Sequence, residues 1–190
     1  MFKYFPTTKE ELVEIIKAEV AERGWNCRLN HIDVSRITDM SYLFGDDWIN
    51  ECYDLEKFNG NISGWNVSKV INMEGMFMHN EYFNRDISKW NVSNVKNMQS
   101  LFSGAESFNQ PIGDWDVSNV INMEYMFCHA HSFNQSIDNW DVSNVDDMGS
   151  IFYEANSFNQ DLSRWKLKTA IAPHMFYNCP IKEEYKPTGI

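Results

Sequence analysis

Residues 83–102 read FNRDISKWNVSNVKNMQSLF, and related versions of this segment recur along the 190-residue chain. Tryptophan marks the recurrence at intervals of 25 residues: Trp65, Trp90, Trp115, Trp140 and Trp165. A fixed period of roughly 20 to 50 residues indicates one supersecondary unit that buries its apolar face only by stacking on copies of itself. The sequence therefore predicts a solenoid.

Apolar spacing within each unit predicts its local structure. The run Ile62-x-x-Trp65-x-Val67-x-x-Val70 has the spacing of a leucine-rich repeat and predicts a short parallel strand. Over residues 70–83 the apolar spacing changes to three, four and six, which predicts one to two helical turns followed by a bend. The expected fold class is an α/β repeat, a leucine-rich-repeat-like solenoid of about six repeats. Short parallel strands would form one face and short helical turns the other.

Polar residues recur at fixed positions beside the predicted strands and helical turns. One column precedes the helical turns and supplies candidate N-caps: Asn72, Asn97, Asn122 and Asp147. A second column is expected to form a buried amide ladder bonded to backbone groups in the turns: Asn59, Asn84, Asn109, Asn134 and Asn159. The tryptophans and the methionines at 73, 98, 123 and 148 are predicted core residues.

The ends of the array differ from its centre. Repeats start near residues 25, 58, 83, 108, 133 and 158, and the first carries about eight extra residues within 45–57. Thr8 and Glu11 form a candidate capping box before an apolar stripe, so residues 1–24 are predicted to be an N-terminal capping helix. Residues 25–181 would be the solenoid, with a degenerate last repeat, and residues 182–190 a C-terminal tail.

Charge and composition restrict the partners. The formal net charge is −11, which disfavours nucleic acid and favours a protein partner with a basic surface. The four cysteines form no C-x-x-C motif, so neither a disulfide framework nor a zinc knuckle is expected. No signal peptide or membrane span is recognisable, so the chain as written is expected in the cytoplasm. The cell surface is the alternative if a leader has been removed, and we expect a monomer.

The repeat resembles a known family. The pattern Trp-[Asp/Asn]-Val-Ser-Asn-Val-x-[Asn/Asp]-Met-x-x-[Met/Leu]-Phe, followed by Ser-Phe-Asn-Gln, is similar to the repeat of BspA-like leucine-rich-repeat surface proteins over about residues 25–180. Such proteins occur on bacterial surfaces and in some protists and large viruses. The resemblance implies a leucine-rich-repeat solenoid used for adhesion or protein binding, without enzymatic activity.

Outward-facing residues beside the core positions are the candidate partner-binding residues. They are Asp33, Asn66, Asn91, Asp114, Asp116, Asp141 and Lys166. The insertion adds Trp48 and Tyr53, aromatic residues within an acidic segment that is typical of a protein-binding loop. The alternative for the insertion is that its aromatic residues pack under the N-terminal helix as part of the cap.

Enzymatic and metal sites are weak hypotheses. Asp116 and Asp141 are stacked neighbours, which raises a glycosidase or cation site, but the repeat offers no expected pocket or differently tuned acid. His79 and His129 lie two repeats apart, too far to share a zinc ion. We therefore expect no enzyme, no cofactor and no metal. The predicted function is a non-catalytic protein-binding module; the alternatives are a bacterial or viral surface adhesin that binds host proteins and a purely structural array.

Overall fold

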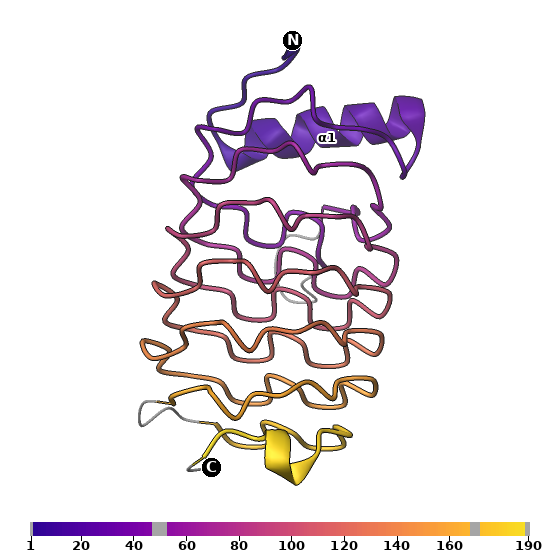
Figure 1. Ribbon diagram of the computed structural model, residues 1–190. Coiled ribbons are helices and arrows are strands. Elements are labelled where there is room, and N and C mark those ends of the chain that lie inside the picture. The colour runs from indigo at the N-terminus through magenta and orange to yellow at the C-terminus, as the bar shows by residue number, and fades with distance from the viewer. Residues whose placement is uncertain (1, 47–52, 168–171, 189–190) are drawn as a thin grey trace.

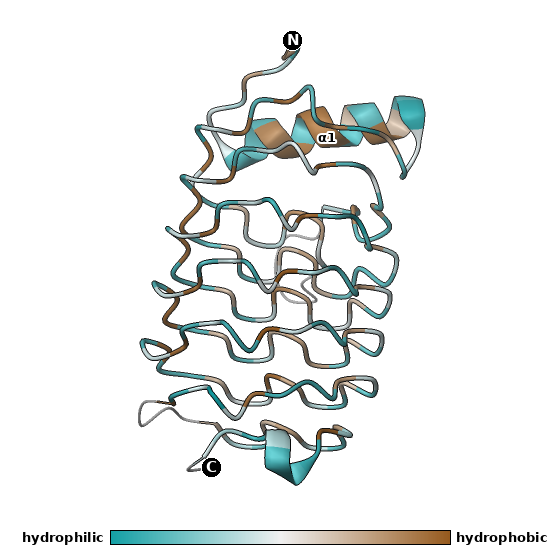
Figure 2. Cartoon of the chain, viewed as in Figure 1, coloured by the Kyte–Doolittle hydropathy of each residue, from teal (hydrophilic) through white to brown (hydrophobic). Residues whose placement is uncertain are grey.

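The computed structural model describes residues 2–46, 53–167 and 172–188. One α-helix, α1 (Lys9–Arg23), lies across the N-terminal end of a stack of similar coils, and the 3-10 helix η1 (Glu183–Tyr185) lies near the other end (Figure 1). Polar and apolar residues alternate along each coil (Figure 2). Trp48 lies outside the described residues.

Helix α1 begins and ends at residues suited to those positions. The Thr8 hydroxyl accepts a hydrogen bond from the Glu11 amide at 3.2 Å, and Gly24 follows the last turn with φ of 80°. The Glu11 carboxylate reaches the Thr7 amide at 2.7 Å, one residue earlier than in a capping box. The buried face of α1 packs on the first coil through Leu12, Val13, Ile16 and Val20.

The predicted parallel strands are absent from the described residues, so the prediction of an α/β leucine-rich-repeat-like solenoid was wrong. Between neighbouring coils of the described residues, β-type pairing is limited to isolated parallel bridges, such as Asn72 with Asn97 and Asn97 with Asn122. The expected strand at residues 62–70 is two tight turns, in which the amides of Trp65 and Val70 donate to the carbonyls three residues before them at 3.1 and 2.9 Å. Apolar residues three apart therefore occupy the two ends of a turn, where both side chains point into the core.

The predicted helical turns were also wrong. The amides of Met73, Gly75 and Phe77 donate to carbonyls of the next coil, those of residues 97, 99 and 101, at 2.8 to 3.0 Å. Alternate amides are therefore used between coils and cannot make the bonds of an α-helix. Gly75 and His79 have φ of 56° and 57°, a left-handed conformation that further interrupts any helix. Asn72 does accept the amide of Glu74, at 3.1 Å, but a turn follows it instead of a helix.

The core prediction is confirmed. Each tryptophan of the column is 2 to 4% exposed, and its indole Nε1 donates to a carbonyl of the preceding coil at 3.0 to 3.2 Å. Phenylalanines stack from coil to coil, with ring centroids 6.2 Å apart for Phe83 and Phe108 and 6.0 Å apart for Phe108 and Phe133. The methionine column is fully buried. One continuous core therefore runs the length of the stack.

The asparagine ladder exists, but it is not buried. The Asn59 side-chain oxygen accepts the Asn84 amide at 3.2 Å, and Asn84 and Asn109 repeat this bond to the next coil at 3.0 Å. Gln110 and its equivalents at 135 and 160 donate to the same asparagines. Asn84 and Asn134 are exposed and the others half-buried. The ladder thus joins coils at the surface, where water competes for its hydrogen bonds.

Candidate functional site

Four of the predicted binding residues occupy one equivalent position in successive coils: Asn66, Asn91, Asp116 and Asp141. All four are exposed, and each side-chain oxygen accepts the amide of the serine two residues later at 3.1 to 3.2 Å. At Asp116 the serine hydroxyl donates as well, at 2.6 Å. This column therefore has a structural role, because an Asn or Asp side chain closes the turn in every copy.

The carboxyl groups of Asp141 and Asp33 have lowered pKa values. Hydrogen bonds from the Ser143 side chain and amide lower the pKa of Asp141, and Lys166 adds a smaller effect in the same direction. Asp33 occupies the same position in the first coil, half-buried, and Ser35 lowers its pKa in the same way. Both side chains therefore carry their negative charge at neutral pH.

Asp114 belongs to the neighbouring column, which holds Gly64, Lys89, Asn139 and Arg164 in other coils. Asp114 is exposed and directly precedes the buried Trp115, and Asp116 directly follows Trp115. We call Asp114, Asp116 and Asp141 the acidic row. Towards the C-terminal end, Lys166 is exposed and the Arg164 guanidinium lies 3.7 Å from the Asp138 carboxylate. The acidic row is therefore bordered by positive charge on one side.

Tyr53 lies away from the acidic row. It is half-buried against the core, and the Lys17 ammonium of α1 lies 5.8 Å from its ring centroid. This position supports the alternative in which the insertion contributes to the cap. Tyr53 also lines a hollow of about 510 Å³ together with Trp25 and Leu55.

A second polar hollow, of about 440 Å³, was not predicted. Its lining comprises Asp46, Glu56, His79, Glu81, Gly104, Glu106, His129 and His131. His79 and His129 both line this hollow, and their common repeat phase is the one sequence feature that could have indicated it. The His129 Nδ1 lies 3.3 Å from a Glu154 carboxylate oxygen. Within the described part of the chain, no group of three or more His, Cys, Asp or Glu side chains is arranged to hold a metal ion.

Comparison with known protein families assigns the chain to one of them. A family described as Mycoplasma protein of unknown function, DUF285, matches residues 18–128 and again 88–186. The chain belongs to the DUF285 family. This is the family of the BspA-like repeat proteins, so the resemblance is confirmed at the level of the family, while the specific repeat motif stays a prediction. No curated protein and no solved structure matches the chain.

Membership of DUF285 gives no activity, because the family is described as one of unknown function. Among the residues that the structure describes, no helix is long and apolar enough to cross a membrane.

Proposed function

We propose that this DUF285 chain is a non-catalytic protein-binding scaffold whose acidic row contacts a basic surface of a protein partner. One observation carries the proposal. Asn66 and Asn91 close the same turn as Asp116 and Asp141 with similar hydrogen bonds, so the fold needs a side-chain oxygen there but no charge. The carboxylates of the acidic row are therefore available for recognition.

The surroundings of the acidic row fit a protein ligand better than a small substrate. Its three carboxylates are exposed side chains from two adjacent coils, and the indoles between them are buried. Exposed carboxylates of one sign speed the approach of a cationic surface and disfavour nucleic acid. A small substrate would require a concave, largely apolar site around the reacting groups.

The experiment replaces aspartate by asparagine, the residue that other copies of the repeat carry at the position of Asp116 and Asp141. The triple variant Asp114→Asn, Asp116→Asn, Asp141→Asn removes three charges and retains the turn bonds. A matched control, Glu22→Gln, Glu81→Gln, Glu106→Gln, removes three exposed charges elsewhere. Proteins captured from native lysate by the wild-type chain would be identified by mass spectrometry, purified and titrated calorimetrically against all three forms.

We expect the triple variant to bind the purified partner at least about tenfold more weakly, with an unchanged Tm and a reduced dependence on salt. The control should bind like the wild-type chain. Equal affinity of all three forms for every captured protein would refute the proposal and leave a purely structural array as the explanation.

A surface adhesin is a second candidate, favoured by membership of the family of BspA-like repeat proteins. In that case the partner of the acidic row would be a host protein. Antibody labelling of intact against permeabilised cells separates the two candidates, because an adhesin is labelled before permeabilisation.

A further inference from the structure

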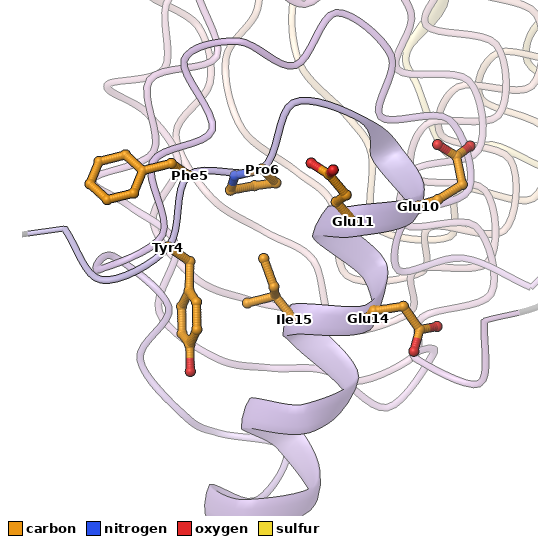
Figure 3. A pocket seen from close by; sticks show the side chains of 7 residues that line it. All are labelled: Tyr4, Phe5, Pro6, Glu10, Glu11, Glu14 and Ile15. Carbon is orange, nitrogen blue, oxygen red and sulfur yellow. The ribbon is translucent and has the colours of Figure 1, made fainter.

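A hollow of about 540 Å³ opens at the N-terminal end of the stack, between the segment before α1 and α1 itself (Figure 3). Tyr4, Phe5 and Pro6 come from the segment and Ile15 from the helix, and together they make the apolar part of the lining. The Phe5 side chain is 57% exposed, although it is large and apolar. Such exposure beside a hollow marks a place where a ligand could bury apolar surface.

The two walls of this hollow are fixed in place. The Lys3 amide donates to the His31 carbonyl at 2.7 Å, and the Asp33 amide donates to the Tyr4 carbonyl at 2.9 Å. These bonds attach the N-terminal segment to the first coil. Pro6 is buried, and α1 starts directly after Thr8. The hollow therefore belongs to the folded cap.

Three glutamates of α1 are also among the residues that line the hollow: Glu10, Glu11 and Glu14 (Figure 3). Glu11 is already bonded to Thr7, whereas the Glu14 side chain is 77% exposed and its nearest cation, the Lys17 ammonium, is 4.0 Å away. Hydrogen bonds at the start of α1 lower the pKa of Glu10. No Lys or Arg is among the described residues that line the hollow.

We propose that this hollow binds a peptide segment of a partner protein in which an apolar side chain stands next to a lysine or arginine. The apolar side chain would cover Phe5, Tyr4 and Ile15, and the cation would approach Glu14 and Glu10. Long basic side chains suit such a site, because their stems pack on apolar surface while their charged ends remain with the carboxylates. This site differs from the acidic row, where the large side chain between Asp114 and Asp116, that of Trp115, is buried.

Charge complementarity decides between the possible occupants. An acidic peptide would place like charges against Glu10 and Glu14, and an anionic lipid surface would meet the same repulsion. A second copy of this chain would bring a net charge of −11 to an acidic site. An apolar and basic segment is the occupant that satisfies both the exposed Phe5 ring and the carboxylates.

The test uses the whole chain and a fluorescein-labelled peptide of alternating leucine and lysine, titrated by fluorescence anisotropy. Two further peptides replace either every leucine by serine or every lysine by glutamate. The variants are Phe5→Ala and Glu14→Gln. Their matched controls are Tyr177→Ala, which removes an aromatic ring that is 49% exposed on the last coil, and Glu22→Gln, which removes an exposed carboxylate at the other end of α1.

We expect Phe5→Ala to weaken binding on the order of tenfold, because it removes most of the apolar contact. Glu14→Gln should weaken binding about threefold and reduce its salt dependence. Both controls, and the triple asparagine variant of the acidic row, should bind like the wild-type chain at unchanged Tm. Amide chemical-shift changes should be confined to the hollow and its neighbours. The serine and glutamate peptides should bind more weakly.

Equal binding by wild type and Phe5→Ala would overturn this proposal, as would shift changes centred on the acidic row. Self-association in sedimentation that Phe5→Ala abolishes would assign the hollow to a second copy instead. Binding of anionic lipid vesicles that Phe5→Ala abolishes would assign it to a membrane surface. Because the acidic-row variant leaves Phe5 and Glu14 intact, failure of this proposal is distinguishable from failure of the proposed function.

Discussion

The indole Nε1 of Trp115 donates a hydrogen bond to the carbonyl oxygen of Ile87, 28 residues earlier in the chain, at 3.2 Å. The same bond joins every pair of neighbouring coils from the first tryptophan of the column to the last. Each indole therefore fills the core of its own coil and satisfies a backbone carbonyl of the preceding one.

Replacement of Trp115 should destabilise the centre of the stack. Trp115→Ala should lower the free energy of unfolding by about 3 to 5 kcal/mol, because it leaves a cavity and an unpaired carbonyl. Trp115→Phe, which keeps a ring but loses the donor, should cost about 1 to 3 kcal/mol. Denaturant unfolding followed by circular dichroism measures both. Trp25→Phe is the control, since Trp25 is 38% exposed and should change stability by less than about 0.5 kcal/mol.

Two substitutions of Asp116 distinguish the effect of its charge on stability from the effect of its hydrogen bond in the turn. Asp116→Asn should leave the free energy of unfolding within about 0.5 kcal/mol of wild type, because Asn91 makes the same bond to its serine in the preceding coil. Asp116→Ala removes the acceptor and should cost about 0.5 to 1.5 kcal/mol. Thermal unfolding of the two variants side by side checks the expectation. A loss of the same size in both would mean that the charge itself stabilises the coil.

The buried carboxylate of Glu19 should make the cap sensitive to acid. Its side chain is 2% exposed and accepts hydrogen bonds from Lys3 at 3.2 Å and from Arg23, and the His31 Nε2 lies 3.2 Å from a Glu19 carboxylate oxygen. Burial alone would raise the pKa of Glu19, but the neighbouring Arg23, Lys3 and His31 side chains outweigh burial and lower the pKa from 4.5 to about 2. The folded state thus favours the ionised form more than the unfolded state does.

This shift sets the direction of the pH dependence. The stabilisation from Glu19, about 3 kcal/mol by linkage, is complete above pH 4.5 and is lost as the pH falls towards 2. Glu19→Gln should be less stable than wild type at neutral pH and should lose less stability over that window. Urea unfolding at several pH values measures the difference, with Glu22→Gln as a control on the exposed side of α1. Parallel pH curves for wild type and Glu19→Gln would contradict the assignment.

Gly60 marks a close approach between the first two coils. A Cβ atom at this position would lie 2.1 Å from the Cys27 carbonyl oxygen and 2.5 Å from the Phe58 ring. Gly60→Ala should therefore destabilise by about 2 to 4 kcal/mol, because backbone must move to admit the methyl group. Gly64→Ala is the matched control, since its Cβ would meet only the Asn30 side chain, at 3.2 Å. Thermal unfolding of the two variants compares them directly.

The sequence predicted the repeat and its core, but not the backbone between core positions. Burial of Trp65 and Met73 followed from periodicity alone, because only a stack could cover them. An apolar spacing of three is shared by helices and by tight turns, so residues 70–83 matched a helical pattern without forming one. Ser100 and Tyr125 adopt left-handed φ of 54° and 57°, and neither residue type signals that conformation as glycine would. The hydrogen bonds between coils impose it.

The sequence predicted where the side chains of the candidate site lie, but not which hydrogen bonds they make. Exposure of Asp116 and Asp141 followed from their place beside a buried tryptophan. Their turn-closing bonds were not predicted, because the segment was expected to be a strand. The N-terminal hollow depends on the path of residues 2–6 over the first coil, and no repeat pattern encodes that path.

Backbone hydrogen bonds between coils recur at equivalent positions, as from Met73, Gly75, Phe77 and His79 to the following coil and from Met98, Ser100, Phe102 and Gly104 to the one after it. Since donors and acceptors match at these junctions, a duplicated or deleted block of 25 residues would meet partners already in register. Evolution could therefore lengthen or shorten this protein in whole modules, changing the span between its two ends while leaving each end intact.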